Sequence, residues 1–487
     1  MNQFNYPPSP QISDYTFLDP TPSFKKQVKQ TIGAIILFIT VYILLIIAAI
    51  FLLRFCFQAA AAILSSVRGL WPLLISIGLV CLGVMVFVFL FKFIFKVKKI
   101  DTSGSKEIKR KDHPKLFAFI DQLTTELKAP KPKKIFLIPE VNASVFYNSS
   151  FWSMFFPVRK NLNIGLGLVN CLNLSEFKGV LAHEFGHFSQ RSMKLGSYVY
   201  TVNHVVYDLV YSYDRWDRTL QSWADAGGIF GLFAVLTYRI AELVRGLFRF
   251  FYKIINKQNM KLSREMEYNA DLVAVSATGK EAMVSGLRRI VFGDSAYQIV
   301  LNYLNKVLKE NKVPQNFYEL HTAALNKLAK DNKLSLTNGL PVIKDEDIDK
   351  NQPQSRIIFK DQWASHPDQK DRETNINNVD IVADISEDSP WSLFNEPAEL
   401  QREITKELYR DVTFTEKVEP LESAEFLDIV KKDDEKATMP DAYHGFYDNR
   451  LLLEFNWEEA YNNHKNKQVH FLFAAAGQGP GCSQRNF

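Results

Sequence analysis

Five consecutive residues carry the most specific chemical pattern in the chain. They read His183-Glu184-Phe185-Gly186-His187. On a helix, His183 and His187 stand one turn apart on one face, so that both imidazoles can reach one metal ion about 2 Å away. Glu184 lies beside them, where it can take a proton from a metal-bound water. The pattern predicts a zinc-dependent hydrolytic centre; two surface histidines on a helix are the plain alternative.

The residues around this pattern predict the helix that it requires. Ser175 can cap the N-terminus of such a helix, and Glu176 favours its first turn. The apolar side chains that follow recur at helical spacing, at Phe177, Val180, Leu181, Phe185 and Phe188. We therefore expect one face of the helix to be buried.

A catalytic zinc ion usually has three protein ligands and one open position. The chain lacks the third histidine of the longer H-E-x-x-H-x-x-G-x-x-H pattern, because Gln190 and Met193 stand where Gly and His are needed. The third ligand is therefore expected to be a carboxylate from a second helix.

Residues 263–271 (SREMEYNAD) offer that carboxylate. Glu267 and Asp271 lie at i, i+4 on one face, and the small Ala270 and Ala274 allow another helix to pack closely. Two unpaired carboxylates at a packed interface would repel each other, which a metal ion and a histidine would relieve. We expect Glu267 to bind the ion and Asp271 to accept the free N–H of a ligand histidine.

Together these motifs resemble a family of membrane metallopeptidases that includes the bacterial heat-shock protease HtpX and the CAAX prenyl proteases. HEFGH is followed some eighty residues later by SREMEYNAD, as in that family. Asn142-Ala143 resembles its N-A edge-strand element, and His366-Pro367 with Arg372 resembles its H-P-x-x-x-x-R element. The resemblance covers roughly residues 106–379, and the two apolar runs of the chain favour the HtpX-like branch.

The resemblance implies roles for three further residues. Asn142 is expected to bind an extended substrate strand, although a turn asparagine is the alternative. His366 is expected to donate to the oxyanion of the reaction, with Arg372 holding His366 or the substrate backbone. A surface His-Pro turn is the alternative for His366. One zinc ion per chain is implied.

Two apolar runs are long enough to cross a bilayer, at residues 32–57 and 71–95. A buried helix of a soluble protein is the alternative. Flanking Lys and Arg residues place both outer ends on the cytoplasmic side. These residues are Lys25, Lys26 and Lys29 before the first run, and Lys96, Lys98, Lys99, Lys106, Lys109, Arg110 and Lys111 after the second.

A third apolar segment, residues 227–255, carries charges every three or four positions, at Arg239, Glu242, Arg245 and Arg249. Its pattern favours an interfacial helix or an amphipathic helix packed on the protein. A spanning helix with its charges facing inward is the less favoured alternative.

The predicted fold is mainly α with a small β-sheet, in which a zincin-like metallopeptidase domain packs on transmembrane helices. We expect a polar, proline-rich and mobile tail at residues 1–30, two transmembrane helices at 31–100, the metallopeptidase domain at 101–380 and a C-terminal region of unknown role at 381–487. That last region either folds by itself or covers the catalytic domain. Residues 133–140, 142–148 and 161–169 read as the strands of the sheet.

Composition limits the remaining possibilities. The chain has 487 residues, 47% of them apolar, and a net charge of +5, which gives no reason to expect a nucleic-acid partner. Its four cysteines lack C-x-x-C spacing and are expected to be reduced.

The sequence thus predicts a zinc endopeptidase of the cell (inner) membrane with a cytoplasmic catalytic domain. Its expected partners are polypeptide substrates, which include membrane proteins, and the lipid bilayer. The alternatives are a CAAX-type prenyl-protein protease, a catalytically silent membrane scaffold and a transporter component.

Overall fold

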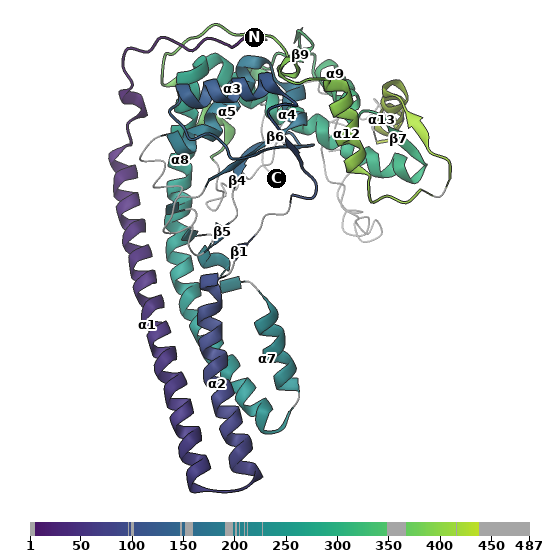
Figure 1. Ribbon diagram of the computed structural model, residues 1–487. Coiled ribbons are helices and arrows are strands. Elements are labelled where there is room, and N and C mark those ends of the chain that lie inside the picture. Colours follow the sequence, from purple (N-terminus) through teal and green to yellow (C-terminus); the bar gives the residue numbers. More distant parts are fainter. Residues whose placement is uncertain are drawn as a thin grey trace, which may run out of the picture. The chain divides into compact units, whose positions relative to one another are not determined.

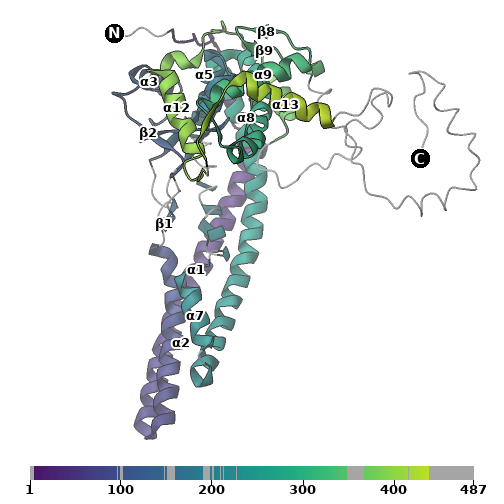
Figure 2. The same cartoon turned by 90° about the vertical axis from the view of Figure 1, so that its right-hand side faces the viewer.

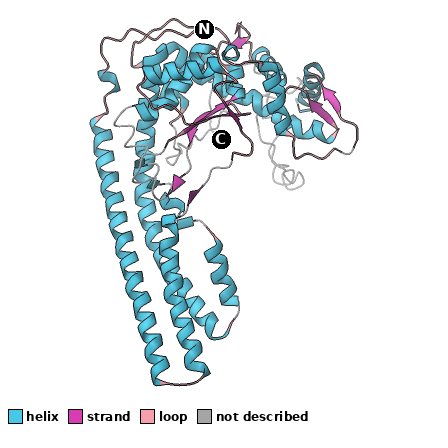
Figure 3. Ribbon diagram, viewed as in Figure 1, coloured by secondary structure: helices cyan, strands magenta, loops and turns pink. Residues whose placement is uncertain are grey.

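The computed structural model describes residues 5–95, 97–98, 102–146, 149–150, 159–189, 198–199, 202–203, 205–208, 210–211, 213–225, 227–347, 367–414 and 416–437. The chain forms two compact units. The first comprises Met1–Gln352 and Arg356–Leu427, and the second comprises Pro353–Ser355 and Asp428–Phe487. Figure 3 shows the predominance of helices over a few short strands, so that the prediction of a mainly α fold with a small sheet is confirmed.

Two long apolar helices, α1 (Pro22–Ser66) and α2 (Leu70–Phe95), form an antiparallel hairpin (Figure 1). Their stretches Phe24–Ser66 and Leu70–Lys92 are each long and apolar enough to cross a membrane. In the most apolar part of the first stretch only 22% is buried, and in that part of the second stretch 39% is buried. Helices that expose so much apolar surface suit a lipid environment better than the core of a soluble protein.

Helix α1 begins at Pro22, about ten residues before the predicted start of the first apolar helix. The Thr21 side chain accepts a hydrogen bond from the Phe24 N–H at 3.1 Å, and Pro22 occupies the first helical turn. Both are favourable signals for a helix start. The predicted tail of residues 1–30 is therefore too long.

The leader before α1 is held against the predicted metallopeptidase domain, contrary to the prediction of a mobile tail. Lys178, whose side chain is fully buried, donates hydrogen bonds to the carbonyl of Pro7 (2.9 Å), to Ser9 Oγ (2.7 Å) and to the carbonyl of Ala277 (2.9 Å). The ring of Tyr6 lies 4.4 Å from the Lys178 ammonium. Because a buried lysine needs polar partners, it fixes the leader in place.

Helix α8 (Gly228–Lys309) contains the ambiguous third apolar segment. Figures 1 and 2 both show the first part of α8 alongside α1 and α2, and rings of Phe38 and Phe248 meet there at 5.7 Å. The segment therefore packs along α1 and α2, as predicted for an amphipathic helix packed on the protein, while α1 and α2 are the only described helices apolar enough to cross a membrane. Only Gly279 (φ 79°) departs from helical geometry within α8, and a Cβ at that position would meet the Ala383 backbone N at 2.8 Å.

One charge of this part of α8, Arg245, faces the short helix α7 (Arg215–Asp225), whereas Arg239 is exposed. Arg245 pairs with Asp217 and, at 3.1 Å, with Glu242. Lys92 pairs with Asp214 at 3.0 Å and with Asp217 at 3.7 Å. Paired charges of this kind can be accommodated between helices that are otherwise apolar.

A four-stranded sheet lies beside helix α5 (Leu174–Ser189), below it in the view of Figure 1. Its strand order is β2-β3-β6-β4, in which β3 and β6 are parallel and the two outer strands are antiparallel to their neighbours. These strands are β2 (Lys106–Ile108), β3 (Ile135–Ile138), β6 (Asn161–Gly165) and β4 (Ala143–Phe146). Among the residues that the structure describes, strand β4 has no neighbour on its outer side, where another strand could be added.

The other described elements are short helices and three pairs of short strands. The helices are η1 (Thr16–Leu18), α3 (Pro114–Glu126), α4 (Leu166–Cys171), α5 (Leu174–Ser189), α9 (Phe317–Asp331), α11 (Gln369–Asn377), η3 (Pro390–Leu393), α12 (Pro397–Leu408) and α13 (Ser423–Ala437). The short strands are β1 (Val97–Lys98) with β5 (Ser149–Ser150), β7 (Lys312–Pro314) with β10 (Glu419–Leu421), and β8 (Leu336–Thr337) with β9 (Leu340–Pro341).

The segment after residue 380 packs on part of the predicted metallopeptidase domain, which was one of its two predicted roles. The carbonyl of Asp388 accepts a hydrogen bond from the Leu174 N–H at 2.8 Å, at the start of α5. The indole of Trp391 donates to Asn170 Oδ1 at 3.2 Å. The segment therefore supports α4 and the start of α5, the helix that carries the H-E-x-x-H pattern.

We expect that deleting residues 2–10 destabilises the protein by about 2 kcal/mol, because Lys178 would stay buried without two of its acceptors. Burial already lowers the pKa of Lys178 to about 8. Thermal unfolding of the detergent-solubilised chain measures the effect. In a Lys178→Met background the same deletion should have a much smaller effect, and equal losses in both backgrounds would contradict this account.

Candidate metal centre

Two helices carry the centre, and they approach each other closely where their side chains are small. A Cβ added to Gly186 on α5 would lie 3.2 Å from Ala270 Cα and 3.2 Å from Val273 Cβ on α8. Glycine at one side and alanine at the other therefore permit this approach. The predicted close packing at Ala270 is thus present, and it brings Glu267 opposite the two histidines.

Helix α5 starts two residues earlier than predicted, and a different side chain caps it. The Glu176 N–H donates to Asn173 Oδ1 at 2.8 Å, and the Asn173 N–H donates to Glu176 Oε2 at 2.9 Å. This reciprocal pair is a capping box. The predicted cap, Ser175, instead accepts a hydrogen bond from the Ser386 N–H at 2.8 Å.

The start of α5 is also fixed to the second half of α8. The buried Arg289 donates to both carboxylate oxygens of Glu176 at 2.9 Å, and Ser285 donates to the same carboxylate at 2.6 Å. Because both charges are buried and fully hydrogen-bonded, removing either partner would leave an unpaired charge in the interior. The helix that carries both histidines is thus held at its N-terminus as well as at Gly186.

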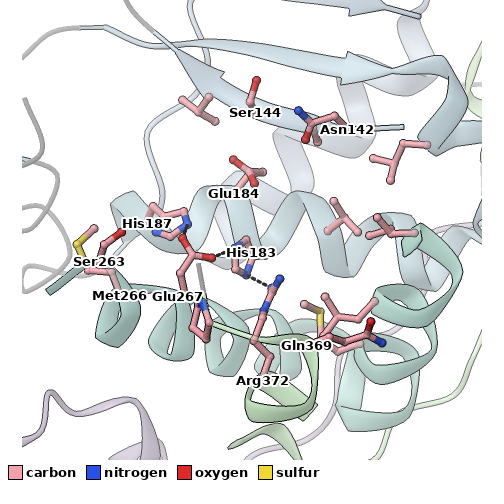
Figure 4. Close-up of a pocket in the computed structure, with 18 of the residues that line it drawn as sticks. Asn142, Ser144, His183, Glu184, His187, Ser263, Met266, Glu267, Gln369 and Arg372 are labelled. Atoms are coloured by element: carbon pink, nitrogen blue, oxygen red, sulfur yellow. Dashed lines mark hydrogen bonds and ion pairs between the residues drawn. The ribbon is translucent and has the colours of Figure 1, made fainter. Parts of the chain in front are cut away.

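The three predicted ligands converge on one point (Figure 4). His183 Nε2 lies 3.4 Å from Glu267 Oε2, and His187 Nε2 lies 3.6 Å from Glu267 Oε1. One ligand atom from each of the three residues lies within 4.8 Å of the others. Ligands bound about 2.1 Å from a tetrahedral ion stand about 3.4 Å apart, so these spacings fit a single metal ion.

Asp271 orients the first of these histidines. His183 Nδ1 lies 2.8 Å from Asp271 Oδ1, so that a proton on Nδ1 leaves the Nε2 lone pair directed at the metal position. Burial lowers the pKa of His183, but hydrogen bonds to Asp271 and Glu267 outweigh burial and raise the pKa to about 9. A cation between these groups would take the place of that proton.

Arg372, on α11, holds Asp271 from the other side. It donates to the two carboxylate oxygens of Asp271 at 2.9 and 2.5 Å, and its Nη2 lies 3.4 Å from His183 Nδ1. Burial raises the pKa of Asp271, but its bonds to Arg372 and His183 outweigh burial and lower the pKa below its usual value. The guanidinium thus lies beside Asp271 and His183. The predicted contact of Arg372 with His366 or with the substrate backbone stays a prediction.

Glu184 and Asn142 line a cavity of about 600 Å³ that also contains the metal position. Figure 4 shows the Glu184 carboxylate between α5 and strand β4, on the side of α5 that faces Asn142 and Ser144. The cavity also has an apolar part, lined by Val141, Leu168, Val180, Met283, Leu287, Ile290 and Val291. The cavity therefore combines the Glu184 carboxylate, the metal position and an apolar wall.

Two glycines bring the start of strand β4 over the site. A Cβ on Gly165 would lie 2.1 Å from the Glu140 carbonyl oxygen, and one on Gly167 would lie 2.8 Å from the Val141 side chain. The Gly165 N–H donates to the Asn142 carbonyl at 2.8 Å. Larger residues at these positions would displace the backbone that carries Asn142.

The structure brings together every predicted site residue except His366, which lies outside the described residues. Pro367, its neighbour, lines the cavity. The sequence analysis did not single out Lys160, which also lines the cavity. Lys160, Leu162 and Ile164 alternate along the sequence, and this spacing could have indicated that all three side chains lie on one face of the strand.

Comparisons with known proteins identify a peptidase family. A family model described as "Peptidase family M48" matches residues 111–380, more than half of the chain. The chain is 24% identical over 200 residues to a protein from Bifidobacterium longum and 24% identical over 191 residues to one from Pyrococcus abyssi, each named "Protease HtpX homolog". These matches cover 40% and 38% of this chain, but only 59% and 60% of the two relatives.

A protein of the same name from Campylobacter curvus is 25% identical over 238 residues, which are 49% of this chain and 73% of the relative. No solved structure matches the chain significantly.

We expect Gly186→Val to lower the metal affinity about tenfold or more, because the added side chain forces α5 away from α8 and separates Glu267 from the histidines. Competition with a chromophoric chelator measures the affinity. The matched control is Gly246→Val on α8, where the nearest atom to an added Cβ is the flexible Arg249 side chain at 3.8 Å. An unchanged affinity in Gly186→Val would contradict the packing argument.

The Asp271→Asn variant should bind the metal about tenfold to a hundredfold more weakly, because the amide holds the Nδ1 proton of His183 less strongly than the carboxylate does. The same titration measures the loss. Glu265→Gln on the same helix removes a carboxylate that is not part of the centre and should leave the affinity unchanged. Equal effects of the two variants would show that Asp271 has no specific role.

Proposed function

The chain belongs to peptidase family M48, and on that premise we propose that it is a membrane-anchored, zinc-dependent endopeptidase. One observation carries the proposal. Two histidine nitrogens and one carboxylate stand at the mutual spacing of metal ligands, beside a glutamate that faces an open sheet edge across a cavity.

The donor set favours zinc among the common divalent metals. Two imidazoles and one carboxylate leave the fourth position of a tetrahedral ion open, as in catalytic zinc sites. When bound, zinc would polarise the scissile carbonyl and lower the pKa of the attacking water. His183, His187 and Glu267 would hold it.

The chemistry of the chain's own residues centres on Glu184. Its carboxylate takes a proton from the attacking water and delivers that proton to the leaving nitrogen of the peptide bond. Asp271 and Arg372 keep His183 in one tautomer and one orientation, so that the site is organised before substrate arrives. The donation of a hydrogen bond from His366 to the oxyanion stays a prediction from the H-P-x-x-x-x-R resemblance.

The substrate would bind as an extended strand on β4. The open edge of β4 offers main-chain hydrogen bonds to any polypeptide, and Asn142 and Ser144 lie along the same edge of the cavity. Main-chain recognition tolerates varied sequences, which suits an enzyme that removes unwanted polypeptides more than one that processes a single target.

The exposed apolar surface of α1 and α2 would anchor the enzyme in a bilayer. The lysines that flank the hairpin on both sides favour a cytoplasmic catalytic domain. Extended segments of membrane proteins near that surface are the substrates that this placement favours.

We expect Glu184→Gln to abolish cleavage of an unfolded protein such as casein by the zinc-loaded, detergent-solubilised chain, while one zinc ion per chain still binds. Loss of the general base lowers the rate by at least about a hundredfold. A chelator should abolish cleavage by the unmutated chain, and added zinc should restore it.

Cleavage that survives Glu184→Gln or complete zinc removal would sink the proposal. Zinc binding without cleavage of casein or of a farnesylated C-terminal peptide would favour a scaffold, and cleavage of the farnesylated peptide alone would favour a prenyl-protein protease.

A further inference from the structure

Helices α1 and α8 each carry three exposed lysines, which we call the lysine band. Those of α8 follow one another at i, i+4 spacing, so that they share one face of the helix over about 12 Å. Among the residues that the structure describes, no partner binds the amine of any lysine of the band. The six residues are Lys25, Lys26 and Lys29 on α1, and Lys253, Lys257 and Lys261 on α8.

The two groups of lysines lie at the same level along the paired helices. Phe38 of α1 packs on Phe248 and Phe251 of α8, with ring centroids 5.7 and 6.0 Å apart. From this contact the lysine-bearing stretches of both helices run towards the level of α5, as Figures 1 and 2 show. At the helical rise, the lysines lie about 14 to 20 Å beyond the contact on α1 and about 5 to 17 Å beyond it on α8.

Acidic residues do not offset this charge along the two helices. Helix α1 has no Asp or Glu, and α8 has none between Glu242 and Glu265. The nearest acid before α1 is Asp19, which carries a single charge. The lysine band therefore gives this part of α1 and α8 a positive surface potential.

The exposed surface of both helices changes from apolar to basic at one level. On α1 the exposed large apolar side chains begin at Ile36, after Lys29. On α8, which is described throughout, they stop at Ile254 and resume only at Val291. Ile36 and Ile254 lie about 3 and 7 Å beyond the contact with Phe38, on the same side of it. Two helices far apart in sequence thus change character within a few ångströms of each other, as expected at the surface of a bilayer.

A cluster of tyrosines marks the same level. The rings of Tyr207 and Tyr211 lie 5.7 and 5.6 Å from that of Tyr252, which directly precedes Lys253 on α8. Tyr207 is 45% exposed and Tyr211 is 49% exposed. Tyrosine is enriched where a membrane meets water, because its ring is apolar and its hydroxyl is polar. The tyrosines therefore indicate a lipid headgroup layer independently of the lysines.

We propose that the lysine band binds the headgroups of anionic phospholipids in the leaflet that faces the catalytic domain. The band adjoins exposed apolar surface, so that a ligand with a negative headgroup and apolar tails matches both, whereas a free anion matches only the lysines. The inference rests on the membrane anchoring of the proposed function and adds the class of lipid that surrounds the anchor. It does not depend on the peptidase reaction.

The test reconstitutes the full chain in phosphatidylcholine vesicles that contain a trace of spin-labelled phosphatidylglycerol or, in a parallel sample, of spin-labelled phosphatidylcholine. Electron paramagnetic resonance measures the fraction of each label that the protein immobilises. At low salt the protein should immobilise phosphatidylglycerol about threefold to tenfold more strongly than phosphatidylcholine. The excess should decline towards none in about 1 M salt, because the Debye length there is only about 3 Å.

Triple variants decide whether the lysine band is responsible. Changing Lys253, Lys257 and Lys261 together to Gln should reduce the excess of phosphatidylglycerol to about half or less, because half of the band loses its charge. Changing the same three residues to Arg keeps the charges and should keep the excess. Thermal unfolding verifies that each variant is folded.

The matched control removes the same number of charges from exposed lysines outside the band and should keep the excess. These residues are Lys330, Lys406 and Lys417, each changed to Gln.

Three results would overturn the inference: no excess of phosphatidylglycerol around the unmutated chain, an excess that survives in the Gln variant of the band, or an equal loss in the control. Failure of the anchoring itself is a separate result, in which the chain does not float with pure phosphatidylcholine vesicles in a density gradient. In that case flotation with vesicles that contain phosphatidylglycerol decides the inference. Flotation that is lost in the Gln variant of the band supports it, and no flotation rejects it.

Discussion

The close approach of α5 and α8 at Gly186 and Ala270 is the constraint on which the rest of the site depends. A metal ion with ligands about 2 Å away tolerates displacements of only a few tenths of an ångström. A single helix places the two histidines one turn apart without help from any other element. The third ligand, in contrast, must come from another element. The absence of a side chain at Gly186 lets the backbone of α8 come near enough for Glu267 to complete the set.

That approach also creates an electrostatic problem, which the surrounding residues solve. Glu267 and Asp271 are both buried, one helical turn apart. Arg372 neutralises Asp271 directly, and the metal ion proposed above would neutralise Glu267. Because Arg372 reaches the pair from α11, some hundred residues further along the chain, the stability of the centre depends on α11 being docked as well as on the α5–α8 contact.

The parts of the site that were predictable from sequence are those set by helical periodicity. His183, His187, Glu267 and Asp271 follow from i, i+4 spacing on two helices, and the small Ala270 indicated where those helices would meet. The cap of α5 was missed because Asn173 and Ser175 are equally suitable cap residues, and only the contact of Ser175 with Ser386 distinguishes them. The docked leader was missed because nothing local to Lys178 signals that its amine is buried against residues far away in sequence.

Helix α8 links the apolar hairpin to the metal centre within one uninterrupted stretch of helix. The ion-paired Arg245 and the ligand Glu267 are 22 residues apart on it, which corresponds to about 33 Å along the helix axis. Since Arg245 shares its partner Asp217 with Lys92, near the end of α2, the centre stands well beyond that end. For the function proposed above, a substrate anchored in the same bilayer would have to offer an extended segment that reaches this far. On that proposal a tightly folded membrane protein would escape cleavage, whereas one with a long or unfolded extramembrane segment would not.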